Sequence, residues 1–167
     1  MKRHLVFAFV AGTCGANAAD LTLSADGLAP GAIGDSTSHL ERVLRQKIPV
    51  ETQPGSCVVV AGFDQEKLGI TYVIEDETLT RINVDYYGKT PSPIRTAAGI
   101  GLGSAEEDVM KAYEGRVRIE SDTGDPSWHF LYVDEPDGSR GLRFDTDGKK
   151  VKSMHAGQYP ALKLGCR

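Results

Sequence analysis

The sequence predicts an α+β protein made of two tandem repeats, each a short helix followed by an antiparallel sheet of about four strands. The composition is that of an ordinary globular chain, with 40% hydrophobic and 25% charged residues, which excludes collagen-like and disordered chains. Short segments of alternating apolar residues, bounded by turn-forming residues, are typical of strands. The chain also repeats itself at an offset of about 70 residues, which indicates a duplicated unit.

The repeat is visible in two matched pairs of segments. Residues 69–73 (GITYV) align with residues 141–145 (GLRFD), and Ile33-Gly34 aligns with Leu102-Gly103 before an amphipathic stretch. The alignment pairs Leu40 with Val109, Tyr72 with Phe144, and Ile82 with Met154. The sequence therefore divides into a first repeat at 19–89, a linker at 90–98 and a second repeat at 99–167.

Each repeat is expected to begin with a capped helix. Asp35 or Ser36 caps the first one, and Ser104 with Glu107 fits the capping box of the second, because such side chains bond to the free ends of the helix backbone. Asp137-Gly138 and Asp147-Gly148 suit the positive φ angles of hairpin turns. The strands are expected at residues 47–52, 56–63, 68–74, 79–87, 116–120, 128–133, 141–144 and 151–155.

The first residues predict export. Lys2 and Arg3 precede an apolar run at 5–11, and Ala16-Asn17-Ala18 supplies the small residues of a cleavage site, so residues 1–18 are interpreted as a signal peptide. Cys14 leaves a lipoprotein as an alternative, although Thr13 stands where Gly, Ala or Ser is expected. The expected location is periplasmic or secreted, since no second apolar stretch is long enough to cross a membrane.

Two cysteines remain after cleavage, Cys57 and Cys166. An even cysteine count in an exported chain predicts one disulfide, which would join the first half of the fold to the extreme C-terminus. Two free buried thiols are the alternative.

An aromatic row is the candidate binding feature. Trp128, Phe130 and Tyr132 share one face of a strand, which indicates either a buried central strand or an exposed row that binds a partner. Tyr87 ends the last strand of the first repeat on a polar face. The predicted partner-binding patch consists of Tyr87, Trp128, Phe130 and Tyr132, rimmed by Arg81, Arg143 and Asp145.

The motifs that carry catalytic or metal chemistry are incomplete. Gly34-Asp35-Ser36 matches a block of one esterase superfamily, but Lys152 stands where the acid before His155 is needed. The run from Asp145 to Gly148 lacks the downstream Glu of a calcium loop, and the histidines lack metal-type spacing. We therefore predict no enzyme, no metal and no cofactor, and the net charge of −4 gives no footprint for nucleic acid.

The predicted tandem architecture resembles the β-lactamase inhibitor proteins, and its single unit is similar to the small outer-membrane-assembly lipoproteins. Residues 99–109 (GIGLGSAEEDV) also resemble the opening of many uncharacterised secreted bacterial proteins. The resemblance to the inhibitors implies that sheets dock onto an enzyme through aromatic and polar residues. It carries over no individual contact residue, because only the architecture matches.

These observations favour an exported protein-binding module whose partner is another envelope or secreted protein. Its most concrete form is a periplasmic inhibitor or immunity-type protein that acts on an enzyme. An envelope structural or assembly factor is the alternative, followed by a small-ligand or carbohydrate binder.

Overall fold

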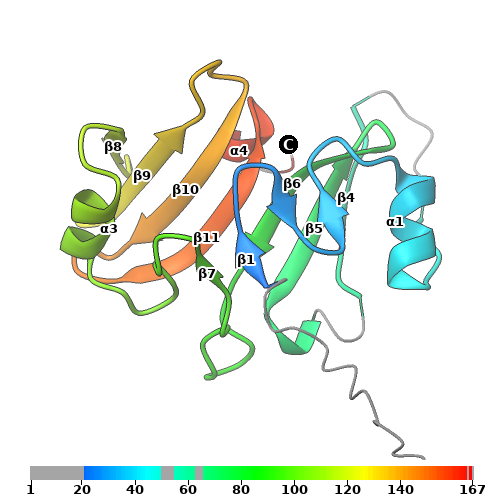
Figure 1. Ribbon diagram of the computed structural model, residues 1–167, viewed down its shortest axis with the longest axis horizontal. Helices are drawn as coiled ribbons and strands as arrows, with labels where there is room; N and C mark the ends of the chain where they lie inside the picture. Colours follow the sequence, from blue (N-terminus) through cyan, green and yellow to red (C-terminus); the bar gives the residue numbers. More distant parts are fainter. Residues whose placement is uncertain (1–20, 50–54, 63–65, 165, 167) are drawn as a thin grey trace, which may run out of the picture.

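The computed structural model describes residues 21–49, 55–62, 66–164 and 166. Its largest element is a seven-stranded antiparallel sheet with the order β4-β5-β6-β11-β10-β9-β8. The strands are β4 (Cys57–Val60), β5 (Ile70–Glu75), β6 (Thr78–Val84), β8 (Val117–Ser121), β9 (His129–Asp134), β10 (Arg140–Thr146) and β11 (Val151–Gln158). The sheet runs across the whole molecule, from β4 at one side to β8 at the other (Figure 1).

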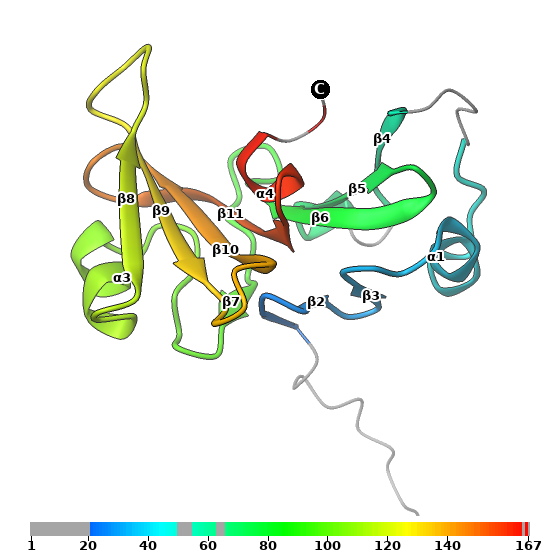
Figure 2. The same cartoon turned by 90° about the horizontal axis from the view of Figure 1, so that it is seen from above.

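Short helices and two small sheets accompany the large sheet. The helices are α1 (Thr37–Leu44), α3 (Glu106–Ala112) and α4 (Ala161–Leu164). The small sheets pair β1 (Thr22–Leu23) with β7 (Arg95–Thr96) and β2 (Gly27–Leu28) with β3 (Gly31–Ala32). Figure 2 shows β2 and β3 on one side of the large sheet and α4 on the other. We call the first side the core face and the side under α4 the outer face.

The hydrophobic core lies on the core face. Alternate residues of every central strand contribute to it, together with Leu40 of α1 and Val109 of α3. Four residues that alternate along β5 and β10 are buried in this core: Ile70, Tyr72, Leu142 and Phe144. The three pairs derived from the repeat are also buried without exception.

The predicted fold class, α+β with two helix-plus-sheet repeats, is wrong. The described chain is mostly β, and its strands form one sheet instead of two. The physical reason is that β6 and β11 pair with each other, Ile82 opposite Ala156, so strands from both halves share one hydrogen-bonded ladder. Helix α1 ends because its C-cap, Arg45, turns the chain at a positive φ of 55°, and α3 ends at its C-cap Tyr113.

The helix caps and one strand expected from the sequence agree with the structure only in part. Ser36 caps α1 and its Oγ accepts from the His39 N–H at 3.3 Å, as predicted. The second cap is one residue later than expected: Ala105 is the N-cap of α3, and the Asp108 carboxylate accepts from its N–H at 3.3 Å. The strand expected at 47–52 is absent from its described part, 47–49. The signal peptide, Cys14 and the cleavage before Ala19 lie outside the described residues.

One disulfide joins Cys57 of β4 to Cys166, with the two Cα atoms 5.5 Å apart and a sequence separation of 109. It therefore ties the C-terminal segment, which follows α4, to an edge strand of the sheet. Among the described residues, no helix is long and apolar enough to span a membrane.

Candidate functional site

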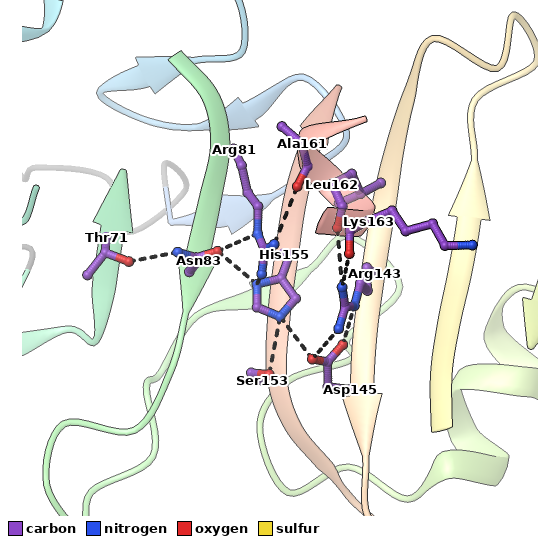
Figure 3. A network of polar contacts seen from close by, with 10 residues as sticks. All are labelled: Thr71, Arg81, Asn83, Arg143, Asp145, Ser153, His155, Ala161, Leu162 and Lys163. Carbon is purple, nitrogen blue, oxygen red and sulfur yellow. Dashed lines mark hydrogen bonds and ion pairs between the residues drawn. The ribbon is translucent and has the colours of Figure 1, made fainter. Parts of the chain in front are cut away.

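The outer face of the sheet carries a cluster of polar side chains on three neighbouring strands. Register brings them together: Arg143 lies opposite His155, Asp145 opposite Ser153, and His155 opposite Asn83. Because side chains alternate between the two faces of a strand, these residues all point to the same side. The outer-face cluster consists of Arg81 and Asn83 from β6, Arg143 and Asp145 from β10, and Ser153 and His155 from β11 (Figure 3).

His155 is the centre of this cluster. Its Nδ1 lies 2.9 Å from Arg81 Nη2 and 2.9 Å from Asn83 Oδ1, which itself accepts from Arg81 Nε at 2.6 Å. A guanidinium can only donate and an amide oxygen can only accept, so Nδ1 accepts in its contact with Arg81 and donates in its contact with Asn83, and the two contacts need different tautomers of the neutral ring. The other ring nitrogen, Nε2, faces Ser153 Oγ at 3.2 Å and Asp145 Oδ2 at 3.4 Å.

Burial controls the protonation of the cluster. Desolvation lowers the pKa of His155 to about 4, and the neighbouring arginines add to this effect against the opposing effect of Asp145. Burial alone would raise the pKa of Asp145, but its contacts with His155 and Arg143 outweigh burial and lower that pKa. At neutral pH the cluster therefore holds a neutral imidazole beside an ionised carboxylate.

Ser153, His155 and Asp145 do not form a catalytic triad. A triad needs the serine on one imidazole nitrogen and the acid on the other, so that the acid orients the ring while the serine loses its proton. Here Ser153 and Asp145 both face Nε2, and Arg81 occupies Nδ1. The arrangement fixes the ring but does not activate the serine hydroxyl.

The two arginines of the outer-face cluster bind α4. Arg143 Nη1 donates to the carbonyl of Lys163 at 2.8 Å, and Arg81 Nη1 donates to the carbonyl of Ala161 at 3.4 Å. The last carbonyls of a helix lack partners within the helix, so cationic donors stabilise its end. Arg143 is only 8% exposed, and its guanidinium lies over the Phe130 ring at 4.2 Å.

A second group of charges tethers the same segment to β8 and β9. Tyr159 donates to Asp134 at 2.6 Å and accepts from Arg118 at 3.0 Å, while Lys163 pairs with Glu120 at 2.8 Å. Burial, followed by the contact with Asp134, raises the pKa of Tyr159, which keeps its phenol protonated as a donor. The outer face is thus closed over β10 and β11 by the chain's own C-terminal segment.

The predicted patch residues fall into two places. Trp128 is 36% exposed and Tyr87 is 49% exposed, and Tyr86 is exposed beside Tyr87. Phe130 is half-buried and Tyr132 is buried. The residues expected as a rim, Arg81, Arg143 and Asp145, lie in the outer-face cluster beneath α4 instead of around Tyr87 and Trp128.

Tyr87 and Trp128 nevertheless lie at one end of the sheet. Tyr87 follows the end of β6 and Trp128 precedes the start of β9. The pairings of Val84 with Met154, Val151 with Thr146, and Thr146 with His129 align these strand ends across the four strands β6, β11, β10 and β9. We call the three exposed rings there, Tyr86, Tyr87 and Trp128, the aromatic end.

Sequence reasoning missed Asn83, Ser153 and His155 as partners of the arginines. The signal was present: polar residues recur at every second position near the end of β6, in β10 and in β11, against apolar residues on the other parity. A period of two with polar residues on the non-core side marks a shared face. The sequence does not show that α4 covers this face.

The remaining motifs have local roles. Asp147 accepts from the backbone N–H groups of Lys149 and Lys150 at 3.1 and 2.8 Å, which is the pattern of a turn. Hydrogen bonds from Lys152 and the turn backbone lower the pKa of Asp147 to about 2. Within the described ranges, no group of three or more His, Cys, Asp or Glu side chains has the arrangement of a metal site.

Comparison with known proteins adds no relative: no family model, no curated protein and no solved structure matches this chain.

Proposed function

We propose that this protein is an exported, non-catalytic binding module that docks onto another envelope or secreted protein through its aromatic end. Inhibition of an enzyme is the most concrete form of this proposal, and it rests on the resemblance to the inhibitor proteins described from the sequence. The export itself is part of the proposal.

The observation that carries it is the exposure of Tyr86, Tyr87 and Trp128 at one end of the sheet. Tyr and Trp are enriched in protein interfaces, where they supply large contact area and a polar atom at low cost in conformational entropy. Trp128 is the only tryptophan of the chain, and it is placed where a partner can cover it.

The aromatic end lies on an ordered part of the structure, and this order supports a binding role. The end belongs to four paired strands, and the outer-face cluster and the Cys57–Cys166 disulfide fix the segment that covers the same sheet. A surface that is ordered before binding loses less entropy when a partner docks. The disulfide also supports export, because disulfides persist in oxidising compartments.

The test is capture of a partner by matched variants. The chain from residue 19 onward is immobilised and exposed to an extract of the periplasm, alongside Trp128→Ala, Tyr87→Ala and the control Val59→Ala. Val59 is 54% exposed on the opposite edge strand β4, so it matches the loss of apolar surface away from the proposed site.

A partner retained by the wild type and by Val59→Ala, but lost with Trp128→Ala at an unchanged thermal midpoint, supports the proposal. Truncation of an interface tryptophan costs roughly 2 kcal/mol or more, about a thirtyfold loss of affinity. A partner that all variants capture equally refutes the aromatic end as the site. If the partner is an enzyme, its activity must fall as the protein is titrated; an unchanged activity refutes inhibition and favours the assembly role.

A further inference from the structure

The free edge of β8 exposes the backbone groups of every second residue. The N–H of Asp122 donates to the carbonyl of Trp128 at 2.9 Å, continuing the register in which Glu120 lies opposite Phe130. Hydrogen-bonded and non-hydrogen-bonded pairs alternate along an antiparallel ladder, so Arg118 and Glu120 direct their backbone groups toward β9. The backbone N–H and C=O groups that point away from the sheet therefore belong to Val117, Ile119 and Ser121.

These outward groups make no backbone hydrogen bond with any other described segment. Ile119, at the middle of the strand, is 46% exposed although it shares a face with the buried Leu131. Figure 2 shows β8 in front of its neighbouring strands, with α3 to one side of it. An open edge with an exposed apolar residue is a template for another strand.

We propose that β8 pairs antiparallel with β8 of a second copy of this chain, with Ile119 opposite Ile119 of the partner subunit. In this register the outward groups of Ile119 exchange bonds with the partner's Ile119. Those of Val117 exchange bonds with Ser121 of the partner subunit, and the same holds in reverse. Every outward group of the strand is then satisfied, and the two sheets become one continuous sheet across a two-fold axis.

Charge selects this register over its neighbours. With Ile119 on the two-fold axis, Arg118 lies opposite Glu120 of the partner subunit, in a pair where side chains approach closely. A slip of two residues keeps the backbone groups matched but brings Arg118 against the partner's Arg118, or Glu120 against the partner's Glu120. Like charges directly opposite destabilise a pair of strands, so the centred register is favoured.

The two charged side chains are already held on the outer face. Arg118 pairs with Glu120 of its own strand at 2.5 Å, contacts Asp134 and Tyr159, and lies over the Tyr132 ring at 4.3 Å; Glu120 also pairs with Lys163. Their orientation is therefore set before association, which reduces the entropy lost on pairing. No ring of the aromatic end belongs to β8, and the contact between Trp128 and Asp122 after the strand is made by backbone atoms that Trp128→Ala keeps. Dimerisation and partner capture are therefore tested with separate variants.

A cysteine placed on the two-fold axis tests the register directly. Residues that exchange backbone bonds across an antiparallel pair have Cα atoms about 5.5 Å apart, within the range of a disulfide. The Ile119→Cys variant of the chain from residue 19 onward should therefore form a covalent dimer on mild oxidation. Val117→Cys is the control, because its two copies would lie about 14 Å apart in this register, too far for a disulfide. Equal cross-linking of both variants, or none with Ile119→Cys, overturns the register.

Sedimentation of the uncross-linked chain provides the second measurement. The wild type should show a concentration-dependent dimer that Arg118→Glu weakens roughly tenfold through like charges opposite each other, and the double variant Arg118→Glu, Glu120→Arg should recover it. Ile119→Pro removes an outward N–H without removing a bond to β9, so it should abolish the dimer while circular dichroism stays unchanged. A chain that is monomeric at every concentration, or a dimer that these variants leave unaltered, overturns the proposal.

Discussion

Replacement of His155 by Gln should remove a defined part of the acid sensitivity of this protein. The folded state lowers the pKa of His155 to about 4, whereas a histidine in an unfolded chain titrates near 6.5. Between these two pKa values, His155 binds a proton in the unfolded chain but not in the folded chain. Stability from this group is therefore complete above about pH 6.5 and is lost as the pH falls toward 4.

The size of the effect follows from the pKa difference. A difference of about 2.5 pH units corresponds to about 3 kcal/mol of unfolding free energy, since each unit is worth about 1.4 kcal/mol. Other groups near His155 titrate as well: burial raises the pKa of Asp85, and contacts lower that of Asp145. The difference between wild type and His155→Gln removes most of their contribution, because both proteins contain them.

The assay is urea unfolding followed by circular dichroism at pH values from 7.5 down to 4. Gln can accept from Arg81 and donate to Asp145, so the variant should retain the fold at pH 7.5. The wild-type advantage should then shrink as the pH falls through the window. His39→Gln is the control background, because it removes a partly buried histidine of α1 and leaves the cluster around His155 intact; the effect of His155→Gln should be the same in it. A pH-independent difference between wild type and His155→Gln would refute the assignment of a buried neutral imidazole.

Three further perturbations test the core, the disulfide and the anchoring of α4. The hydroxyl of Tyr72 is buried without a hydrogen-bond partner, and burial raises its pKa to about 12. Tyr72→Phe should therefore stabilise the fold by about 1 kcal/mol in urea unfolding. A fall of more than about 1 kcal/mol in the free energy of unfolding would contradict this. Replacing both Cys57 and Cys166 by Ala should cost about 4 kcal/mol, because the bond closes a loop with a sequence separation of 109; an unchanged urea midpoint would show that the loop contributes nothing. Arg143→Lys should lower the free energy of unfolding by about 3 kcal/mol, because a lysine cannot bind both Asp145 and the α4 carbonyls. The same variant should speed amide exchange of Lys163 and Leu164. Unchanged exchange would mean that other contacts hold the helix.

Strand positions could be predicted from the sequence better than their assembly. Period-two alternation located the seven strands of the large sheet within a few residues, but it did not find β7, which lies in the expected linker. Alternation contains no information on which strand pairs with which. The pairing of β6 with β11 joins residues 70 to 76 positions apart, and this contact is what turns the expected two sheets into one.

The candidate site, too, could be predicted from the sequence only in part. The prediction of a disulfide between Cys57 and Cys166 is confirmed. Arg81, Arg143 and Asp145 were expected at the rim of an aromatic patch, whereas they lie in the cluster beneath α4. The role of the charged residues was not recognisable, because it depends on a four-residue helix whose carbonyls they bind. A helix that short has no periodic pattern in the sequence.

The C-terminal segment decides which surfaces remain for partners. Tyr159, α4 and Cys166 close the middle of the outer face with hydrogen bonds, ion pairs and a covalent bond, so a partner that docked there would first have to break several buried polar contacts. Leaving one member of a buried charged pair unsatisfied costs several kcal/mol, more than a typical docking contact returns. The aromatic end and the edge of β8 carry no such penalty, because their exposed rings and outward backbone groups gain contacts without losing any. Binding at the margins of the sheet, and not at its centre, is therefore the behaviour that this arrangement favours.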